Sequence, residues 1–274
     1  MDEMEIIQSP QNAQVKEWAA LLTRKGREKA GKFLVEGVHL VSEALRGGNA
    51  GVETVLYVPG TAAERELRSQ KANEASYVRW TAVTDKVMAK VTDAVTPQGI
   101  AAIIRMPTVD LHKLFRADRS SSYIAVDAVQ DPGNLGTIIR SADAVCAAAV
   151  LLGEGTVDVY NPKTVRATMG SIFHLPVVSC DLHAALPLAA KTGVRVMTAT
   201  LAARQNCFEA DLTGPVCFLL GNEGAGVSPK LVELAQDGVN IPIPGHAESL
   251  NVGVAASILL YEALRQRCYR FKEE

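Results

Sequence analysis

The 274-residue chain has a net charge of −2, 48% hydrophobic residues and only 5% aromatic residues, which supplies ample core and argues against a protein coated in basic charge. Five widely spaced cysteines without a CxxC pair and five histidines without ligand spacing indicate neither a disulfide framework nor a metal site. No apolar run is long enough to span a membrane, and the acidic N-terminus lacks the order of a signal peptide, so we expect a cytoplasmic protein. The length suits two domains.

Residues 1–107 have the pattern of a small α/β domain. A helical segment begins near residue 10 and ends in a basic segment that contains Arg24, Lys25, Arg27, Lys29 and Lys32. Strand-like stretches at 32–37, 52–60, 76–80 and 99–107 then alternate with helical stretches at 38–48, 61–73 and 84–92. The basic segment is either a solvated helix end or an edge that contacts phosphates, and the pattern alone leaves both open.

The polar stretch at 108–120 predicts a linker, and residues 121–274 predict a second α/β domain. A strand at 123–129 precedes a turn at 130–136 and a helix at 137–149. Short apolar strands follow near 150–153, 174–180, 194–201, 215–221 and 239–245, separated by helical stretches at 160–171, 181–193 and 228–238. A largely buried helix at 250–267 is the last element.

Three loops of the second domain place polar residues where strands end or helices begin. The turn DPGNLG contains Asn134, the glycine-rich loop GNEGAGV contains Glu223, and the segment ESLNVG contains Ser249 and Asn251. Their glycine spacing fits neither a dinucleotide-binding fingerprint nor a P-loop. Taken singly, the loops are also compatible with a structural role, with Asn134, Ser249 and Asn251 as helix caps. Three such loops in one domain weaken that interpretation.

Two further basic residues, Lys163 and Arg166, lie three apart on the helix that follows Asn161, which we expect to be its cap. They either bind phosphate or solvate a surface helix. No Ser-His-Asp set with a nucleophile-elbow sequence and no Cys-His signature is present. Hydrolysis through a covalent intermediate is therefore disfavoured.

The three loops, in this order, resemble the signature motifs of the SpoU (TrmH-type) family of RNA ribose 2'-O-methyltransferases. The motifs are DPGNLGTIIRSADA, LLGNEGAGVS and IPIPGHAESLNVGVAASILLYE, with NPKTVRATMGSIFHLPV between the first two. The N-terminal stretches SPQNAQVKEW, KFLVEGVHLVSEAL and TPQGIAAIIR resemble the ribosomal-protein-like substrate-binding domain of many members. The chain departs from the family at Val145 and Cys146, where an aromatic residue and glycine are common, and at Gly253, where serine is frequent.

The resemblance implies a C-terminal α/β-knot domain, trefoil-knotted around a mostly parallel sheet, that binds S-adenosylmethionine and forms a homodimer. By motif position, the reaction site comprises Arg140, Asn134, Glu223, Ser249 and Asn251, and the cofactor site comprises Thr200, Leu201, Gly221, Ile241 and Leu250. The N-terminal domain is then expected to bind structured RNA, rRNA rather than tRNA, through Arg24, Lys25, Arg27, Lys29, Lys32, Lys163 and Arg166. A catalytically silent RNA-binding or ribosome-assembly factor on the same scaffold is the alternative.

The family assigns activation of the 2'-hydroxyl to the counterpart of Arg140. A guanidinium is a poor base, because its pKa lies above about 12. We therefore expect Arg140 to orient the hydroxyl and the adjacent phosphate and to stabilise a developing alkoxide.

Overall fold

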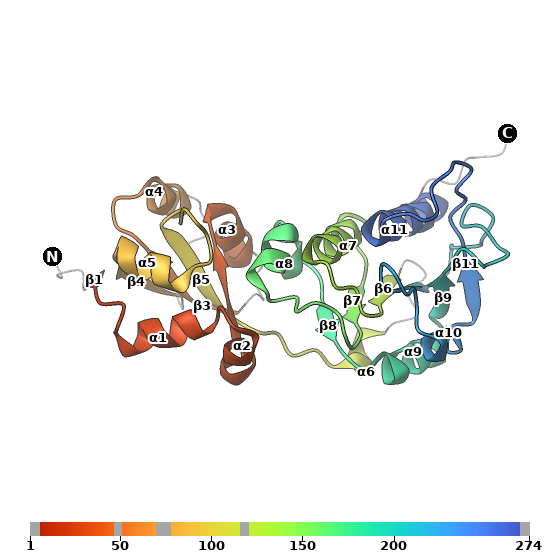
Figure 1. Ribbon diagram of the computed structural model, residues 1–274, viewed down its shortest axis with the longest axis horizontal. Coiled ribbons are helices and arrows are strands. Elements are labelled where there is room, and N and C mark those ends of the chain that lie inside the picture. Colours follow the sequence, from red (N-terminus) through yellow and green to blue (C-terminus); the bar gives the residue numbers. More distant parts are fainter. Residues whose placement is uncertain (1–5, 47–50, 70–77, 116–120, 269–274) are drawn as a thin grey trace. The chain divides into compact units, whose positions relative to one another are not determined.

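The computed structural model describes residues 6–46, 51–69, 78–115 and 121–268, which form two compact units (Figure 1). Unit 1 comprises Met1–Thr108 together with Asp158–Phe173, and unit 2 comprises Val109–Val157 and His174–Glu274. Each unit has its own sheet covered by helices, so the predicted α/β class is confirmed. No helix in the described ranges is both long and apolar enough to cross a membrane.

Unit 1 is built on a five-stranded mixed sheet. In spatial order its strands are β1 (Ile6–Ile7), β4 (Arg79–Val83), β3 (Val52–Tyr57), β5 (Ile100–Arg105) and β2 (Lys32–Glu36). Strands β1, β4 and β3 are parallel, whereas β5 is antiparallel to both β3 and β2. Successive side chains face opposite sides of the sheet, so Phe33 and Leu34 enter two separate hydrophobic cores.

The described residues of the N-terminal sequence form five helices beside this sheet: α1 (Ala13–Ala20), α2 (Arg24–Ala30), α3 (Val38–Arg46), α4 (Ala62–Ser69) and α5 (Asp85–Val91). The basic segment, predicted as the end of a helix, is a helix of its own. Thr23 caps α2 by accepting from the N–H of Gly26 at 3.1 Å, and Gly31 ends it with φ = 62°.

The segment Asp158–Phe173 lies in unit 1, although the sequence places it between strands of unit 2. It contains α8 (Pro162–Ala167), which Asn161 caps as predicted, and the 3₁₀ turn η2 (Ser171–Phe173). Val165 is buried in the unit 1 core, and the ring of Phe33 lies 4.6 Å from that of Tyr160. The predicted domains, residues 1–107 and 121–274, placed this segment in the second domain.

Unit 2 is built on a six-stranded sheet in which all neighbouring strands are parallel. In spatial order the strands are β11 (Asp237–Val239), β9 (Arg195–Ala199), β10 (Val216–Leu220), β6 (Ser122–Val126), β7 (Ala149–Leu152) and β8 (Val177–Ser179). The helices are α6 (Leu111–Leu114), α7 (Pro132–Ala144), α9 (Leu182–Lys191), α10 (Pro229–Val232) and α11 (Val252–Cys268). Strands β6 and β10 are buried along their whole length, which explains their continuous apolar sequences.

Two predicted elements of unit 2 differ from the structure. Helix α7 begins at Pro132, inside the predicted turn, because Pro is favoured in the first turn of a helix. The strand expected at 239–245 ends at Val239. Pro242 and Pro244 lack the backbone N–H groups that continued pairing with a neighbouring strand would need.

Candidate active site

Two of the three polar loops leave neighbouring strands of the unit 2 sheet at the same edge. The loop with Glu223 follows β10, and the loop that leads to Asn134 follows β6, which pairs with β10 in parallel. From β6 the chain proceeds to β7 on the side away from β10, so the strand order reverses between β6 and β10. In open parallel sheets this reversal creates a crevice at the carboxyl ends of the strands, where ligands bind.

Asn134 is the third residue of α7 and not its cap. The cap is Asp131, whose Oδ1 accepts from the backbone N–H of Asn134 at 2.8 Å. The interpretation of Asn134 as a helix cap is therefore wrong. Because Asp131 satisfies the backbone, the side-chain amide of Asn134 is available for other partners.

A chain of hydrogen bonds joins the N-terminus of α11 to Glu223. Asn251 caps α11, since its Oδ1 accepts from the N–H groups of Gly253 at 2.9 Å and Val254 at 3.2 Å. Its Nδ2 therefore faces Asn134 and donates to Asn134 Oδ1 at 2.7 Å. Asn134 Nδ2 in turn donates to Glu223 Oε1 at 2.9 Å. The backbone of α11 thus fixes the orientation of both amides.

The hydrogen bonds to Glu223 keep its carboxylate ionised. Burial by itself raises the pKa of Glu223, but the amide of Asn134 and the nearby backbone N–H groups outweigh burial and hold the pKa below its usual value. Two of these N–H groups belong to Gln130 and Asp131, each 3.4 Å from the carboxylate. At neutral pH Glu223 is an anion and a hydrogen-bond acceptor.

Glycine and asparagine shape the loop that carries Glu223. A Cβ at Gly221 would lie 2.0 Å from the backbone carbon of Gly226, so only glycine allows this fold of the loop. Asn222, which the sequence analysis did not single out, donates to the carbonyl of Ala128 at 2.9 Å and accepts from the N–H of Gly224 at 3.0 Å. The signal for its role was its position directly between Gly221 and Glu223.

Arg140 and Ser249 lie outside this hydrogen-bonded chain. Arg140 is exposed on α7, and in the described part of the chain its guanidinium has neither a hydrogen bond nor an ion pair. Ser249 is exposed in the loop before α11, and within the described residues no hydrogen bond joins its side chain to Asn134 or Glu223. The structure therefore brings together three of the five predicted reaction residues and leaves Arg140 free to meet an anionic ligand.

The predicted cofactor residues follow three neighbouring strands. Thr200 and Leu201 come after β9, Gly221 after β10 and Ile241 after β11. Leu201 is 60% exposed, and Ile241 and Leu250 are partly buried. These apolar side chains at the carboxyl edge suit a planar ring such as adenine. Among the described residues no group of His, Cys, Asp or Glu could hold a metal ion.

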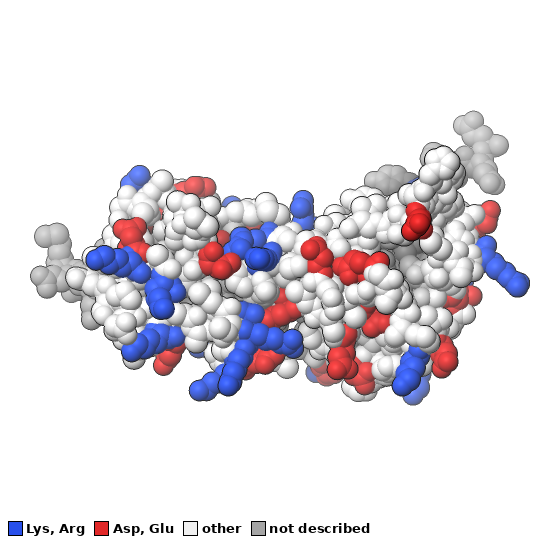
Figure 2. All heavy atoms as spheres, in the orientation of Figure 1, with Lys and Arg blue, Asp and Glu red and all other residues white. Residues whose placement is uncertain are grey.

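Helix α2 of unit 1 presents most of the predicted RNA-binding residues, and Figure 2 shows Lys and Arg atoms gathered over it. Lys25 and Lys29 are exposed and have no ion-pair partner within the described residues, as is also true of Lys163 on α8. Arg24 pairs with Glu28 at 2.7 Å on the surface, and Lys32 pairs with Glu53 at 2.6 Å.

Arg27 is unavailable to RNA, which corrects its predicted role. Its side chain is only 3% exposed, and it donates to the carbonyl of Leu21 at 2.8 Å and forms an ion pair with Asp158 at 2.5 Å. It holds the segment Asp158–Phe173 within unit 1. No local pattern indicates this burial, since Arg27 stands among exposed basic residues.

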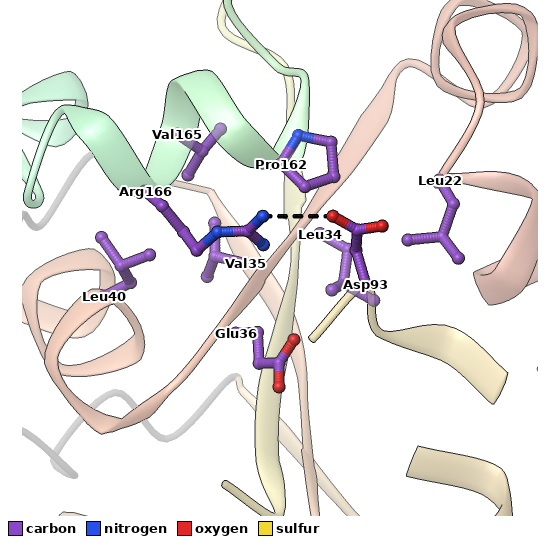
Figure 3. A pocket seen from close by; sticks show the side chains of 9 residues that line it. All are labelled: Leu22, Leu34, Val35, Glu36, Leu40, Asp93, Pro162, Val165 and Arg166. Atoms are coloured by element: carbon purple, nitrogen blue, oxygen red, sulfur yellow. Dashed lines mark hydrogen bonds and ion pairs between the residues drawn. The ribbon is translucent and has the colours of Figure 1, made fainter. Parts of the chain in front are cut away.

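Arg166 also has a partner in unit 1. It pairs with Asp93 at 3.1 Å above a small pocket into which Glu36 extends (Figure 3). Burial raises the pKa of Glu36, opposed by the N–H of Ala94 and the charge of Arg166. Both members of the Arg166–Asp93 pair are about half exposed, so the pair is weak and does not exclude phosphate binding.

The chain matches two family models. The SpoU rRNA Methylase family matches residues 121–261, and the MRM3-like substrate binding domain matches residues 12–102. The resemblance inferred from the motifs is confirmed.

Full-length relatives agree with these matches. The chain is 40% identical to the 23S rRNA (guanosine(2553)-2'-O)-methyltransferase RlmP of Bacillus subtilis, over 94% of this chain and 98% of that protein. It is 35% identical to a 23S rRNA (uridine(2479)-2'-O)-methyltransferase of Streptomyces viridochromogenes, over 93% and 91%. The crystal structure of an AdoMet-bound rRNA methyltransferase from Sinorhizobium meliloti superposes with a TM-score of 0.84 at 33% identity, covering 95% of this chain and 97% of that one.

Proposed function

We infer that this chain, which belongs to the SpoU rRNA methylase family, is an S-adenosylmethionine-dependent enzyme that methylates a ribose 2'-hydroxyl of rRNA. Two relatives that it matches over more than nine-tenths of its length are named for this reaction on 23S rRNA. The observation that carries the proposal is the Asn251–Asn134–Glu223 chain, which joins residues of all three family motifs at one edge of the sheet.

We propose that the cofactor lies against the loops that follow β9, β10 and β11. Thr200, Leu201 and Ile241 present side chains there, and Gly221 lets the backbone of the loop after β10 fold closely against Gly226. Leu250 adds apolar surface just before α11. S-Adenosylmethionine supplies an electrophilic methyl group on a sulfonium. Apolar side chains beside polar loop residues fit such a ligand.

In the proposed reaction, the protein aligns the ribose oxygen with the methyl carbon and takes up the hydroxyl proton. The oxygen forms a bond to the methyl carbon as the carbon–sulfur bond breaks, and S-adenosylhomocysteine is released. Glu223, the anion at the end of the amide chain, accepts the hydrogen bond of the hydroxyl and then its proton, which passes on to water. Arg140, which is unpaired among the described residues, binds the neighbouring phosphate and stabilises the developing alkoxide. Ser249, exposed beside α11, completes the acceptor side of the site.

We propose that unit 1 binds the rRNA through α2. Lys25 and Lys29, which have no ion-pair partner among the described residues, offer two ammonium groups to phosphates. Arg24 and Lys32 add charge when a phosphate replaces Glu28 or Glu53 as their partner. Lys163 and Arg166 on α8 belong to the same unit. The match of residues 12–102 to a substrate-binding domain model supports this assignment.

Three further proposals follow from family membership. The chain between β10 and α11 is threaded as a trefoil knot, and two subunits associate as a homodimer. Val254 and Tyr261, seven residues apart on one face of α11, are 45% and 51% exposed and support an apolar contact between subunits. The third proposal is that the enzyme acts in the cytoplasm.

The test is transfer of label from methyl-tritiated S-adenosylmethionine to purified 23S rRNA, with bulk tRNA as the comparison. Label on rRNA, mapped to a single alkali-resistant 2'-O-methylated nucleotide, is the expected result. RNA binding without transfer would instead identify a silent assembly factor, and transfer only to tRNA would refute the rRNA assignment.

A further inference from the structure

The hydrogen-bonded chain of the active site continues into the contact between α7 and α11. Ser257 Oγ donates to the carbonyl of Gly253 at 2.7 Å and lies 2.7 Å from Ser141 Oγ on α7. Ser257 has a single hydroxyl hydrogen and gives it to Gly253, so Ser141 must be the donor in the bond between the two serines. Gly253 therefore accepts from Ser257 and donates to Asn251, and it links the two groups of hydrogen bonds.

The two helices approach closely at Gly253. A Cβ at this position would lie 3.0 Å from both Cβ and Cγ2 of Thr137, closer than side-chain carbons normally come. The pair Thr137 and Gly253 is one helical turn from the pair Ser141 and Ser257. Both pairs thus belong to one contact line between α7 and α11.

We propose that Gly253 and Ser257 are positioning residues that set α11 against α7 so that Asn251 reaches Asn134. This proposal rests on the proposed function, since it assigns the two residues to the same reaction site. Asn251 is the cap of α11 and moves with the first turn of that helix. A larger residue at 253 pushes this turn away from Thr137, and loss of the Ser257 hydroxyl removes the bond that ties the turn to α7.

The close approach at Gly253 predicts that two substitutions can compensate for one another. The side chain of Thr137 occupies the space that a Cβ at position 253 would need. Removing the side chain of Thr137 should therefore offset the effect of a methyl group added at position 253.

The experiment compares Gly253→Ala, Thr137→Gly, their combination and Ser257→Ala with the wild-type enzyme. Gly214→Ala is the matched control, because a Cβ there meets no atom within 4 Å. We expect Gly253→Ala to lower kcat about 10²-fold, the scale of an ångström misplacement at a reaction site, with KM for rRNA unchanged. Ser257→Ala should lower kcat about fivefold, and Thr137→Gly should restore most of the activity lost in Gly253→Ala.

A second readout does not depend on activity. In nuclear magnetic resonance spectra the side-chain amide hydrogens of Asn134 and Asn251 should exchange slowly in the wild-type protein and in the double variant, and faster in Gly253→Ala and Ser257→Ala. Wild-type kcat and wild-type exchange rates in Gly253→Ala and Ser257→Ala would overturn the proposal. So would a folded double variant in which Thr137→Gly does not restore the activity lost in Gly253→Ala. Absence of transfer by the wild-type enzyme would refute the proposed function instead, and the exchange rates would still test the contact.

Discussion

The side-chain amide of Asn134 donates to the carboxylate of Glu223 at 2.9 Å, across 89 residues of sequence. Asn134→Asp keeps the size of the side chain and replaces this donor by a second carboxylate. We expect kcat to fall by about 10²–10³-fold, as for loss of one preorganised hydrogen bond in an active site, with little change in the Kd of S-adenosylmethionine. Asn12→Asp, which keeps a capping oxygen on α1, is the control and should behave as wild type.

The lowered pKa of Glu223 predicts how pH acts on the enzyme. A carboxyl group whose pKa is lower in the folded protein contributes stability above its unfolded pKa, and that contribution is lost as pH falls through the folded value. We expect kcat/KM to stay constant on acidification until the pH drops below 4.5, the usual value for Glu. In Asn134→Ala the pKa of Glu223 loses one of the hydrogen bonds that lower it, so the fall of kcat/KM on acidification should begin at a higher pH. An unchanged pH profile would mean that Glu223 does not control this fall.

Arg140→Ala is expected to reduce transfer to background while S-adenosylmethionine still binds, because the side chain lies outside the cofactor loops. Arg140→Lys should recover little activity, since an ammonium lacks the planar pair of donors that a phosphate and an alkoxide require. Isothermal titration with the cofactor, run beside the transfer assay, separates the two steps. Wild-type turnover in Arg140→Ala would end the assignment.

Lys25→Ala with Lys29→Ala should weaken rRNA binding and lower the slope of log K against log salt by about 1 for each lost phosphate contact. The matched control is Lys86→Ala with Lys90→Ala, which removes two exposed lysines of α5 in the same unit. Filter binding across a salt series measures the affinity and the salt slope of both double variants. Equal slopes for the two double variants would exclude α2 as the RNA contact.

Arg27→Met is expected to destabilise unit 1 by about 3–5 kcal/mol, because it leaves the carboxylate of Asp158 without its buried partner. Arg24→Met, which breaks the exposed pair with Glu28, should change the free energy of unfolding by about 0–1 kcal/mol. Unfolding by denaturant measures the free energy of unfolding of each variant against the wild type. Similar losses in the two variants would contradict the buried role of Arg27.

Local pattern in the sequence was enough to predict the α/β class and most of its elements. The strands that became β6 and β10 read as unbroken apolar runs because both of their faces are covered. The family motifs likewise selected Asn134, Glu223 and Asn251, which the structure brings into one hydrogen-bonded chain. Composition and spacing predict the elements because burial and backbone geometry act within a few residues, whereas the site residues followed from the resemblance to the family motifs.

The tertiary structure decided what depends on partners distant in sequence. Asp131 and Asn134 are both good cap residues, and only the position of Glu223 shows what the side chain of Asn134 binds while Asp131 caps the helix. Arg27 looks like its basic neighbours until Asp158, 131 residues away, is placed against it. The same holds for Gly253, where Thr137 on another helix leaves no space for a side chain. Such contacts follow from the packing of whole elements, which no local pattern records.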